Sequence, residues 1–337
     1  MQTFAIDRKL SGRIKGVAIL MMLIHHIFTF PGWIVAGHYE PARWFVSLAN
    51  GPSKLCVALF AFITGWAFCL AADKSLKSSA KRVLRFYKMY WLCTVLCMAV
   101  AVGCGWRPGL PALVSELTGW HPELMKFCWY VFFYLLVMLI LPLTAGISDK
   151  GLLWGFVCLT AAPAGAFLVL SRVSVGGYAW NNLLHLLQYF PCVEMGYLCC
   201  RYDLFGRARR ALSRVPDWVL APVCILAACV GKRLVASQDW LYGTLLVFGL
   251  ACALRHTATA VGKGLAWVLE KLGALSTWLW FLHCLFFADA TRGLLQPVLY
   301  WSANPVLVFA AAMVLLIPAA CAVEALSRAL RLSGGKK

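Results

Sequence analysis

Charged residues are scarce in this sequence, and acidic residues are the scarcest. Asp, Glu, Lys and Arg together make up 13% of the 337 residues, about half the share that soluble domains carry. The 13 acidic residues stand against 31 Lys and Arg, while 62% of the chain is hydrophobic. An ordinary soluble protein is therefore excluded, because such a chain has too few polar residues to cover its surface.

The sequence motifs of several common chemistries are missing as well. There is no Gly-x-Ser-x-Gly elbow, no P-loop and no Gly-x-Gly-x-x-Gly fingerprint, so serine-hydrolase and nucleotide-hydrolysis chemistries have no support. None of the 15 cysteines forms a Cys-x-x-Cys pair, and no zinc-type spacing occurs. Most cysteines lie in apolar runs, where a free thiol packs as a small hydrophobic group. We therefore expect no bound metal.

Apolar runs of about 20 residues recur along the whole chain, and each is long enough to cross a membrane as a helix. The first run follows a basic stretch but lacks an Ala-x-Ala-like cleavage site, so we interpret it as a retained helix. We predict an all-α integral membrane protein, with about ten helices in a single bundle that forms one domain over 1–337. The expected spans are 14–35, 52–72, 88–105, 126–145, 151–171, 183–200, 217–236, 240–254, 267–288 and 304–327.

Basic residues gather in alternate segments between these spans. With the amino terminus inside, the inner segments hold 23 of the 31 Lys and Arg, and 8 remain outside. Cytoplasmic loops of membrane proteins carry such an excess, so both termini are predicted to be cytoplasmic. The same distribution explains the net charge of +18, and we do not expect nucleic-acid binding.

Lys15 and His26 are separated by ten residues within the first expected span. Eleven helical steps bring the two side chains to within about 20° of one face, roughly 16 Å apart along the axis. The cation then lies at a membrane surface and the imidazole near the midplane, where ionisable groups are costly and often functional. His25 lies about 80° from that face and is the weaker candidate.

A basic ridge leads into the third expected span. Lys81, Arg85 and Lys88 fall at i, i+4 and i+7, and Arg82 precedes Arg85 by three residues. Two interpretations stand: anchoring among anionic lipid headgroups, or binding of the phosphates of a cytoplasmic cofactor. In the second interpretation Lys15, at the same depth, would contribute to the phosphate site.

Few other polar groups lie inside the apolar runs. Glu194 is in the middle of the sixth span and His283 is near the end of the ninth. An intramembrane histidine can serve only as a hydrogen bond between helices, or it can belong to a functional site. Asp289 and Arg292 close the ninth span on the outside, and we expect them to form an ion pair.

Five segments, taken in chain order, resemble the membrane acyltransferase-3 family. They are a basic residue followed after ten positions by histidine at 15–26, a Thr-Gly pair within 56–66, Arg-x-x-Arg leading into Tyr-Trp at 82–91, Trp-Tyr at 129–130, and 272–283, which ends in histidine. The resemblance covers 10–325. Where the family usually has arginine this chain has Lys15, which keeps the charge but loses the forked hydrogen bonding of a guanidinium group. The family's Ser-Gly is Thr64-Gly65, and the hydrolase-like domain that follows the last span in some members is not expected here.

The resemblance implies a ten-helix enzyme of the bacterial inner (cytoplasmic) membrane, in contact with membrane lipids. Such an enzyme transfers an acyl group, usually acetyl, from cytoplasmic acyl-CoA (acetyl-CoA) to a hydroxyl of an envelope glycan or lipid-linked sugar acceptor. This predicts an O-acetyltransferase of polysaccharide modification. The expected catalytic residues are His26, His25 and Glu194. The residues expected to bind the donor are Lys15, Arg82 and Arg85, and those expected to bind the acceptor are His283, Trp129 and Tyr130.

The alternative is a non-enzymatic transporter or small-molecule-binding membrane domain, in which the same polar groups line a permeation path. Transporters of that kind have broken helices at matching positions in two halves. Prolines occur at 142, 163, 191 and 318, but no symmetry between two halves is visible. Coenzyme A release or acetyl labelling in vesicles would separate the two classes.

Overall fold

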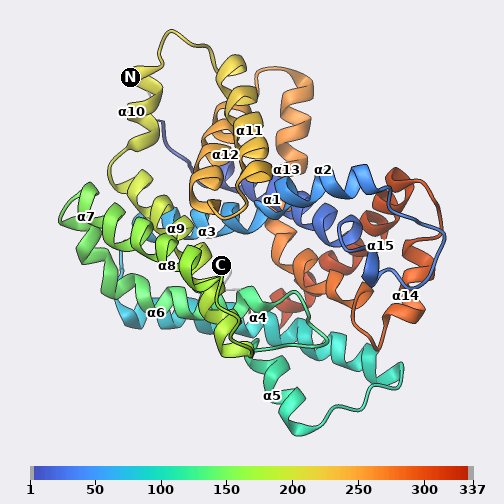
Figure 1. Cartoon of the computed structure of the whole chain (residues 1–337). Coiled ribbons are helices and arrows are strands. Elements are labelled where there is room, and N and C mark those ends of the chain that lie inside the picture. Colours follow the sequence, from blue (N-terminus) through green and yellow to red (C-terminus); the bar gives the residue numbers. More distant parts are fainter. Residues whose placement is uncertain (1–3, 333–337) are drawn as a thin grey trace. The chain divides into compact units, whose positions relative to one another are not determined.

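Helices make up all the regular structure of this protein in the computed structural model, which describes residues 4–332 (Figure 1). Each predicted span falls on a helix, which confirms the all-α class. The corresponding elements are α1 (Arg8–Phe28), α3 (Cys56–Cys69), α4 (Leu76–Gly103), α6 (Trp129–Asp149), the run of α7 (Leu152–Phe156), η2 (Val157–Ala161) and α8 (Ala162–Leu170), α9 (Tyr178–Arg201), α11 (Asp217–Leu234), α12 (Asp239–Leu254), α13 (Ala260–Leu282) and α15 (Pro305–Ala329). Shorter elements between them are η1 (Pro31–Trp33), α2 (Arg43–Lys54), α5 (Leu110–Thr118), α10 (Leu204–Ala211), η3 (His283–Phe286) and α14 (Arg292–Leu299).

Six helical segments in the described part of the chain are long and apolar enough to cross a membrane. They are Arg8–Phe28, Arg43–Cys69, Leu76–Gly103, Trp129–Asp149, Leu152–Leu170 and Pro305–Ala329. This composition makes the chain a multi-pass membrane protein. The helix α12 is apolar but only 16 residues long, and α13 carries Lys263, Glu270 and Lys271, which lower its hydropathy. The total of ten crossings and the cytoplasmic placement of both termini stay predictions.

Several predicted boundaries differ from the structure, among them the end of the first span and the start of the third. The first span was expected to continue to residue 35, but α1 ends at Phe28. Pro31 disfavours the helical conformation of the residue before it, and Phe30 accordingly has φ −120° and ψ 73°. The third span was expected to begin at residue 88, but α4 begins at Leu76. The 28 residues of α4 extend for about 42 Å, longer than the roughly 30 Å of the hydrocarbon layer, so its basic first turns can lie outside it.

The helices separate into two compact units by the contacts of their backbones. Unit 1 comprises Met1–Met22, Asn50–Leu76 and Leu139–Ala274, and unit 2 comprises Leu23–Ala49, Lys77–Met138 and Leu275–Lys337. The boundaries fall within α1, α2, α6 and α13 and after the first residue of α4, so each of these helices contributes residues to both units. The expected single domain over 1–337 stays a prediction.

Glycines allow close backbone contacts between helices of unit 1. A Cβ atom added to Gly65 on α3 would overlap the carbonyl group of Val193 on α9, and one added to Gly196 would overlap the carbonyl of Phe62. The same holds for Gly16 of α1, where an added Cβ would overlap the backbone of α13. Small residues at such crossings let helices pack tightly where no hydrophobic effect drives them together. This explains why the Thr-Gly pair of the second span carries a glycine.

Ion pairs in unit 1 join helix ends that the predicted topology assigns to one side of the membrane. Arg201, at the end of α9, lies 2.7 Å from Asp149 at the end of α6. Asp217, which begins α11, pairs with Arg209 at 2.8 Å and with Arg255 just after α12. These contacts are those expected of helices that alternate in direction, and they support the predicted alternation.

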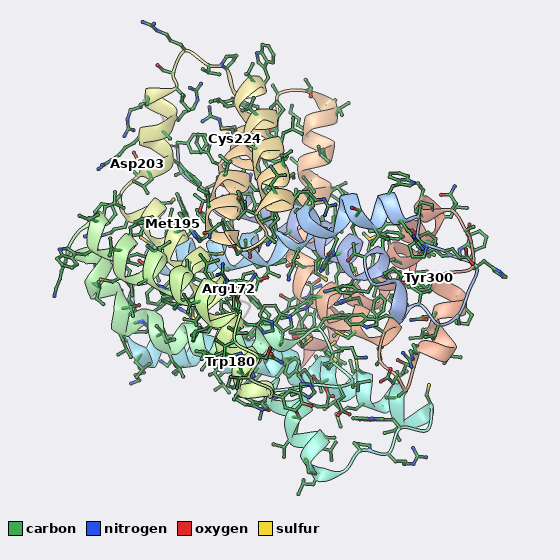
Figure 2. The ribbon with its side chains drawn as sticks, viewed as in Figure 1. Arg172, Trp180, Met195, Asp203, Cys224 and Tyr300 are labelled. Carbon is green, nitrogen blue, oxygen red and sulfur yellow. The ribbon has the colours of Figure 1, made fainter. Side chains whose placement is uncertain are left out.

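In unit 2, α4 packs on α13 through aromatic side chains. The ring of Phe281 lies 5.9 Å from that of Phe86 and 5.3 Å from that of Tyr90. Tyr300, labelled in Figure 2, follows α14, and its hydroxyl donates a 2.8 Å hydrogen bond to the carbonyl of Ile27 in the last turn of α1. The end of α1 is therefore fixed to the region after α14, close to the position of His26.

Candidate active site

A pair of histidines in unit 2 forms the centre of the candidate site. His26 lies in the last turn of α1, and His283 is the first residue of η3, directly after α13. His26 Nδ1 lies 2.8 Å from His283 Nε2, a hydrogen-bond distance. The sequence analysis assigned the two residues to different roles, catalytic and acceptor-binding. The structure brings them into direct contact.

The surroundings of His283 determine which nitrogen of His26 carries a proton. His283 Nδ1 is hydrogen-bonded to the carbonyl oxygen of Trp280, which can only accept, so Nδ1 must be protonated. In the neutral ring, His283 Nε2 is then the acceptor, and His26 Nδ1–H donates to it. The basic lone pair of neutral His26 therefore lies on Nε2. This is the arrangement by which a second group orients a histidine that acts as a base.

An aromatic wall covers the two imidazoles. The ring of Phe127 stacks on His26 at a centroid distance of 3.9 Å and an interplanar angle of 15°, and it lies 5.2 Å from His283. Trp33 extends this wall, 4.9 Å from Phe127. His283 has no exposed surface, whereas His26 is only half-buried. Of the two imidazoles, only that of His26 therefore keeps exposed surface.

His25 occupies a different environment from its neighbour. Its Nδ1 lies 3.0 Å from Thr29 Oγ1, and that hydroxyl donates its own proton to the His25 carbonyl. His25 Nδ1–H is therefore the donor to Thr29. The ring is 6% exposed and lies 5.3 Å from that of His26. The hydrogen bonds of His25 stabilise the end of α1 and give it a structural role, while its catalytic role stays a prediction.

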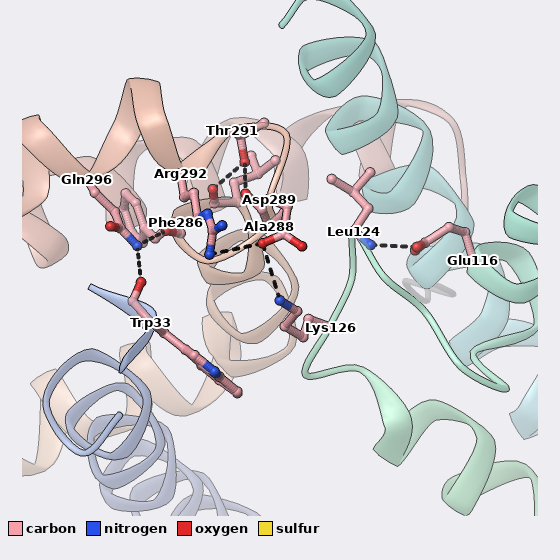
Figure 3. Close-up of polar contacts among 11 residues, drawn as sticks. Trp33, Glu116, Leu124, Lys126, Phe286, Ala288, Asp289, Thr291, Arg292 and Gln296 are labelled. Atoms are coloured by element: carbon pink, nitrogen blue, oxygen red, sulfur yellow. Dashed lines mark hydrogen bonds and ion pairs between the residues drawn. The ribbon is translucent and has the colours of Figure 1, made fainter. Parts of the chain in front are cut away.

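Charged residues from two loops of unit 2 and from the start of α14 meet beside the aromatic wall (Figure 3). Arg292 lies 3.0 Å from Asp289, which confirms the expected pair. Lys126 is also close to Asp289, at 3.7 Å, and its ammonium group lies 5.5 Å from the centre of the Trp33 ring. Since Lys126 directly precedes Phe127, these contacts help to place the wall.

The loop that carries Phe127 is held by a buried carboxylate that the sequence analysis missed. Glu116, on α5, accepts hydrogen bonds from the backbone N–H groups of Glu123, Leu124 and Met125, at 2.5, 2.6 and 3.1 Å. Figure 3 shows the bond from Leu124. A carboxylate that satisfies three amides fixes the conformation of the segment. The segment continues directly into Phe127.

The donor-binding candidates Arg82 and Arg85 also belong to unit 2. They lie on the early turns of α4, where Arg85 is exposed and Arg82 is half-buried. The residue after Arg85 is Phe86, whose ring lies 6.4 Å from that of Trp280 on α13. Trp280 is one turn before His283. The two cations therefore lie on a helix that packs against the segment carrying the histidine pair.

Comparison with known families identifies the chain. The acyltransferase domain of the acyltransferase-3 family matches residues 13–325, which includes both histidines of the pair. The chain belongs to the acyltransferase-3 family. Comparison with curated proteins and with solved structures gave no match. Membership makes this protein a membrane acyltransferase, and the resemblance noted in its sequence is confirmed.

Trp129 and Tyr130, predicted to bind the acceptor, begin α6 of the acyltransferase. The ring of Tyr130 lies 5.6 Å from that of Trp280, whose indole N–H donates to the carbonyl of Phe127 at 3.3 Å. The two residues are therefore connected to the aromatic wall through Trp280. Their role in acceptor binding stays a prediction.

The remaining candidates of the acyltransferase, Lys15 and Glu194, lie in unit 1. Lys15 is half-buried on α1. Glu194 is 1% exposed on α9, and one of its carboxylate oxygens accepts a hydrogen bond from Ser148 on α6. This contact joins α6 to α9 and provides a structural role for the buried carboxylate. The catalytic role of Glu194 and the donor-binding role of Lys15 stay predictions.

Residues that sequence reasoning missed are mainly those around the histidine pair: Phe127, Trp280 and Glu116. Phe127 and Trp280 look like ordinary aromatic residues of apolar segments. Glu116 gave a usable signal, because it is one of only 13 acidic residues and lies in a largely apolar stretch. Cys128 and Cys284, which the sequence analysis did not single out, have sulfur atoms 3.7 Å apart, and each follows a residue of the site directly.

Proposed function

We propose that this acyltransferase moves an acetyl group from cytoplasmic acetyl-CoA to a hydroxyl group of a cell-envelope glycan or a lipid-linked sugar, as an O-acetyltransferase of the bacterial inner membrane. Family membership supports the reaction class. The observation that carries the proposal is the contact between His26 and His283, which leaves the proton-accepting lone pair of His26 on Nε2.

His26 acts as the general base in this proposal. Its Nε2 accepts the proton of the acceptor hydroxyl while that oxygen attacks the carbonyl carbon of the thioester. The new C–O bond forms, the C–S bond breaks, and the departing sulfur takes the proton back from His26. The products are the acetyl ester and free coenzyme A. His283 is the positioning residue, since it holds the reactive tautomer of His26 and accepts a hydrogen bond from the transient imidazolium.

Arg82 and Arg85 hold the phosphates of the donor in this proposal. Arginine offers forked, charge-assisted hydrogen bonds to phosphate oxygens. Arg82 lies one turn before Phe86 on α4, and Trp280 lies one turn before His283. Because the rings of Phe86 and Trp280 are neighbours, the distance from Arg82 to His283 along the helix axes is about 10 Å. The pantetheine arm, more than ten bonds long, can extend over such a distance. We propose the same role for Lys15, which stands where the family has arginine.

The acceptor hydroxyl is positioned by the aromatic residues near the pair in this proposal. Trp129 and Tyr130 supply flat apolar faces for a sugar ring, and the tyrosine adds a hydroxyl that can donate or accept. The half-buried face of His26 is the point at which the hydroxyl meets the base. The wall formed by Phe127 keeps bulk water from the other face.

The proposal is tested with membrane vesicles from cells that produce the protein together with their native envelope glycans. Radiolabelled acetyl-CoA is supplied on the cytoplasmic face, and label in the glycan fraction and release of coenzyme A are both measured. His26→Gln is expected to lower transfer by about 10²- to 10⁴-fold, the usual contribution of a general base. His38→Gln is the matched control, since His38 is an exposed histidine of a loop and should leave transfer unchanged.

Full acetyl transfer by His26→Gln, in protein of normal yield and elution on size exclusion, would refute the proposal. Absence of both label and coenzyme A release in the wild type, together with uptake of a sugar into the vesicles, would favour the transporter alternative instead.

A further inference from the structure

A cavity in unit 1 is separate from the chemistry proposed for His26. It has a volume of about 460 Å³, and its lining comes from α2, α8, α9 and α11 and from the residues that follow α8 and α11. The side chains that matter most are Lys54, Phe167, Ser171, Gln188, Lys232 and Arg233. A volume of this size lies within the range of about 300–1,000 Å³ that small-molecule sites occupy.

The helix ends around this cavity are those that the predicted topology assigns to the outer face. Lys54 and Ser171 lie at the outer ends of the second and fifth spans, and Lys232 and Arg233 at that of the seventh. The positive-inside rule leaves only 8 Lys and Arg on that face, yet three of them line this one cavity. Topology does not explain this gathering of cations, because outer ends normally lack them.

Lys232, one member of a buried ion pair, lines the cavity. Lys232 is buried and lies 2.6 Å from Asp239, and Gln188 donates a 2.7 Å hydrogen bond to the other oxygen of that carboxylate. A buried ion pair of this kind is neutral as a unit and holds its members rigidly. Lys54 and Arg233 are exposed at the cavity. The lining holds three cations and no acid, and Asp239 neutralises only Lys232, so the cavity carries a net positive charge.

The lining also suits a sugar ring. Phe167 presents an aromatic face, and Ser171, Gln188, Asn50 and Ser237 present hydroxyl and amide groups. Sites for small molecules combine an apolar surface with a few well-placed polar groups in this way. The cations add a requirement for negative charge on the ligand, since oxyanions form the strongest hydrogen bonds with Lys and Arg.

We propose that this cavity is a binding site for an anionic saccharide, a sugar-sized molecule that carries a carboxylate or a phosphate. Phe167 packs against the apolar face of the ring, and the hydroxyl and amide groups bind its hydroxyls. Lys54 and Arg233 bind the oxyanion. The argument does not depend on acetyl transfer at His26.

The test uses the purified full-length protein in nanodiscs of phosphatidylcholine, with binding measured by saturation-transfer NMR and calorimetry. The probes are glucuronate, glucose 1-phosphate and neutral glucose. At least one of the two anionic sugars is expected to bind at least tenfold more tightly than glucose, and more weakly as salt is raised. Lys54→Gln combined with Arg233→Gln is expected to raise the Kd of that sugar by at least about tenfold. Both residues are exposed, so the double variant should fold.

Arg107→Gln is the matched control, since it removes one exposed cation of the predicted outer face that does not line the cavity. It should leave the Kd unchanged. Equal binding of glucose and both anionic sugars, no binding of any probe, or an unchanged Kd in the double variant would each overturn the proposal. Binding of phosphatidylglycerol supplied in the nanodisc, with no binding of any sugar, would also overturn the proposal, because the occupant would then be a lipid headgroup. The readout is binding alone, so its failure leaves the acetyl-transfer proposal untouched.

Discussion

Replacement of His283 tests the geometry of the histidine pair most directly. His283→Leu fills the buried position with an apolar side chain and removes the acceptor nitrogen that lies 2.8 Å from His26 Nδ1. During the reaction this hydrogen bond would have a charged donor, since His26 becomes an imidazolium. Hydrogen bonds to charged groups contribute about 1.5–3 kcal/mol. At 1.36 kcal/mol for each factor of ten, kcat is expected to fall by about 10- to 150-fold.

The variant His283→Gln separates positioning from simple packing. Its amide oxygen can accept the proton of His26 Nδ1–H, so kcat should recover part of the loss seen with His283→Leu. The KM for acetyl-CoA should change little in either variant, because the donor phosphates are bound elsewhere in the proposal. The assay is initial-rate kinetics in the vesicle system, with size exclusion and thermal melting as checks of folding. Equal kcat values for the leucine variant and the wild type, or a loss confined to KM, would refute the reasoning.

Two further predictions follow from the donor site and from the helix crossings. Arg82→Gln combined with Arg85→Gln should raise the KM for acetyl-CoA by at least about tenfold with a smaller effect on kcat, because charge-assisted phosphate contacts are lost. Lys150→Gln, which removes an exposed cation of the predicted inner face, is the control. An unchanged KM in the double arginine variant would contradict the donor assignment. Gly65→Leu should abolish the folded, monodisperse protein in fluorescence-detected size exclusion, because the added side chain would overlap the backbone of α9. The control is Gly165→Ala, which changes a helical glycine with open space around it and should elute normally. Similar melting temperatures for the two variants would show that the crossing of α3 and α9 is not tight.

The helices and the first histidine could be predicted from local patterns. Apolar runs specify helices because every backbone polar group must be satisfied within the segment in lipid. His26 stood out because an ionisable group in such a run needs a reason. The pairing of Asp289 with Arg292 was expected because both residues close the same span on the outside, and the structure confirms it.

The partner of His26 could not be predicted in the same way. His26 and His283 are 257 residues apart, and no local spacing connects them. The position of Phe127 over the ring depends on the Glu116 carboxylate and on a loop, neither of which has a periodic pattern. The end of α1 at Phe28 was missed because hydropathy continues through Pro31, while the conformation does not.

The Glu116 carboxylate has a consequence for experiments that exchange segments between members of the family. The stretch 119–128, which follows α5, could be treated as a variable surface loop and replaced alone. Three of its backbone amides, however, donate to the Glu116 side chain, and the segment that they fix ends at Phe127, which stacks on the His26 ring. A chimera that takes the loop without its own acid, or the acid without its own loop, would lose the ring that covers His26 while keeping both histidines of the pair. Its inactivity would then be misassigned to the acceptor specificity that such exchanges are meant to reveal.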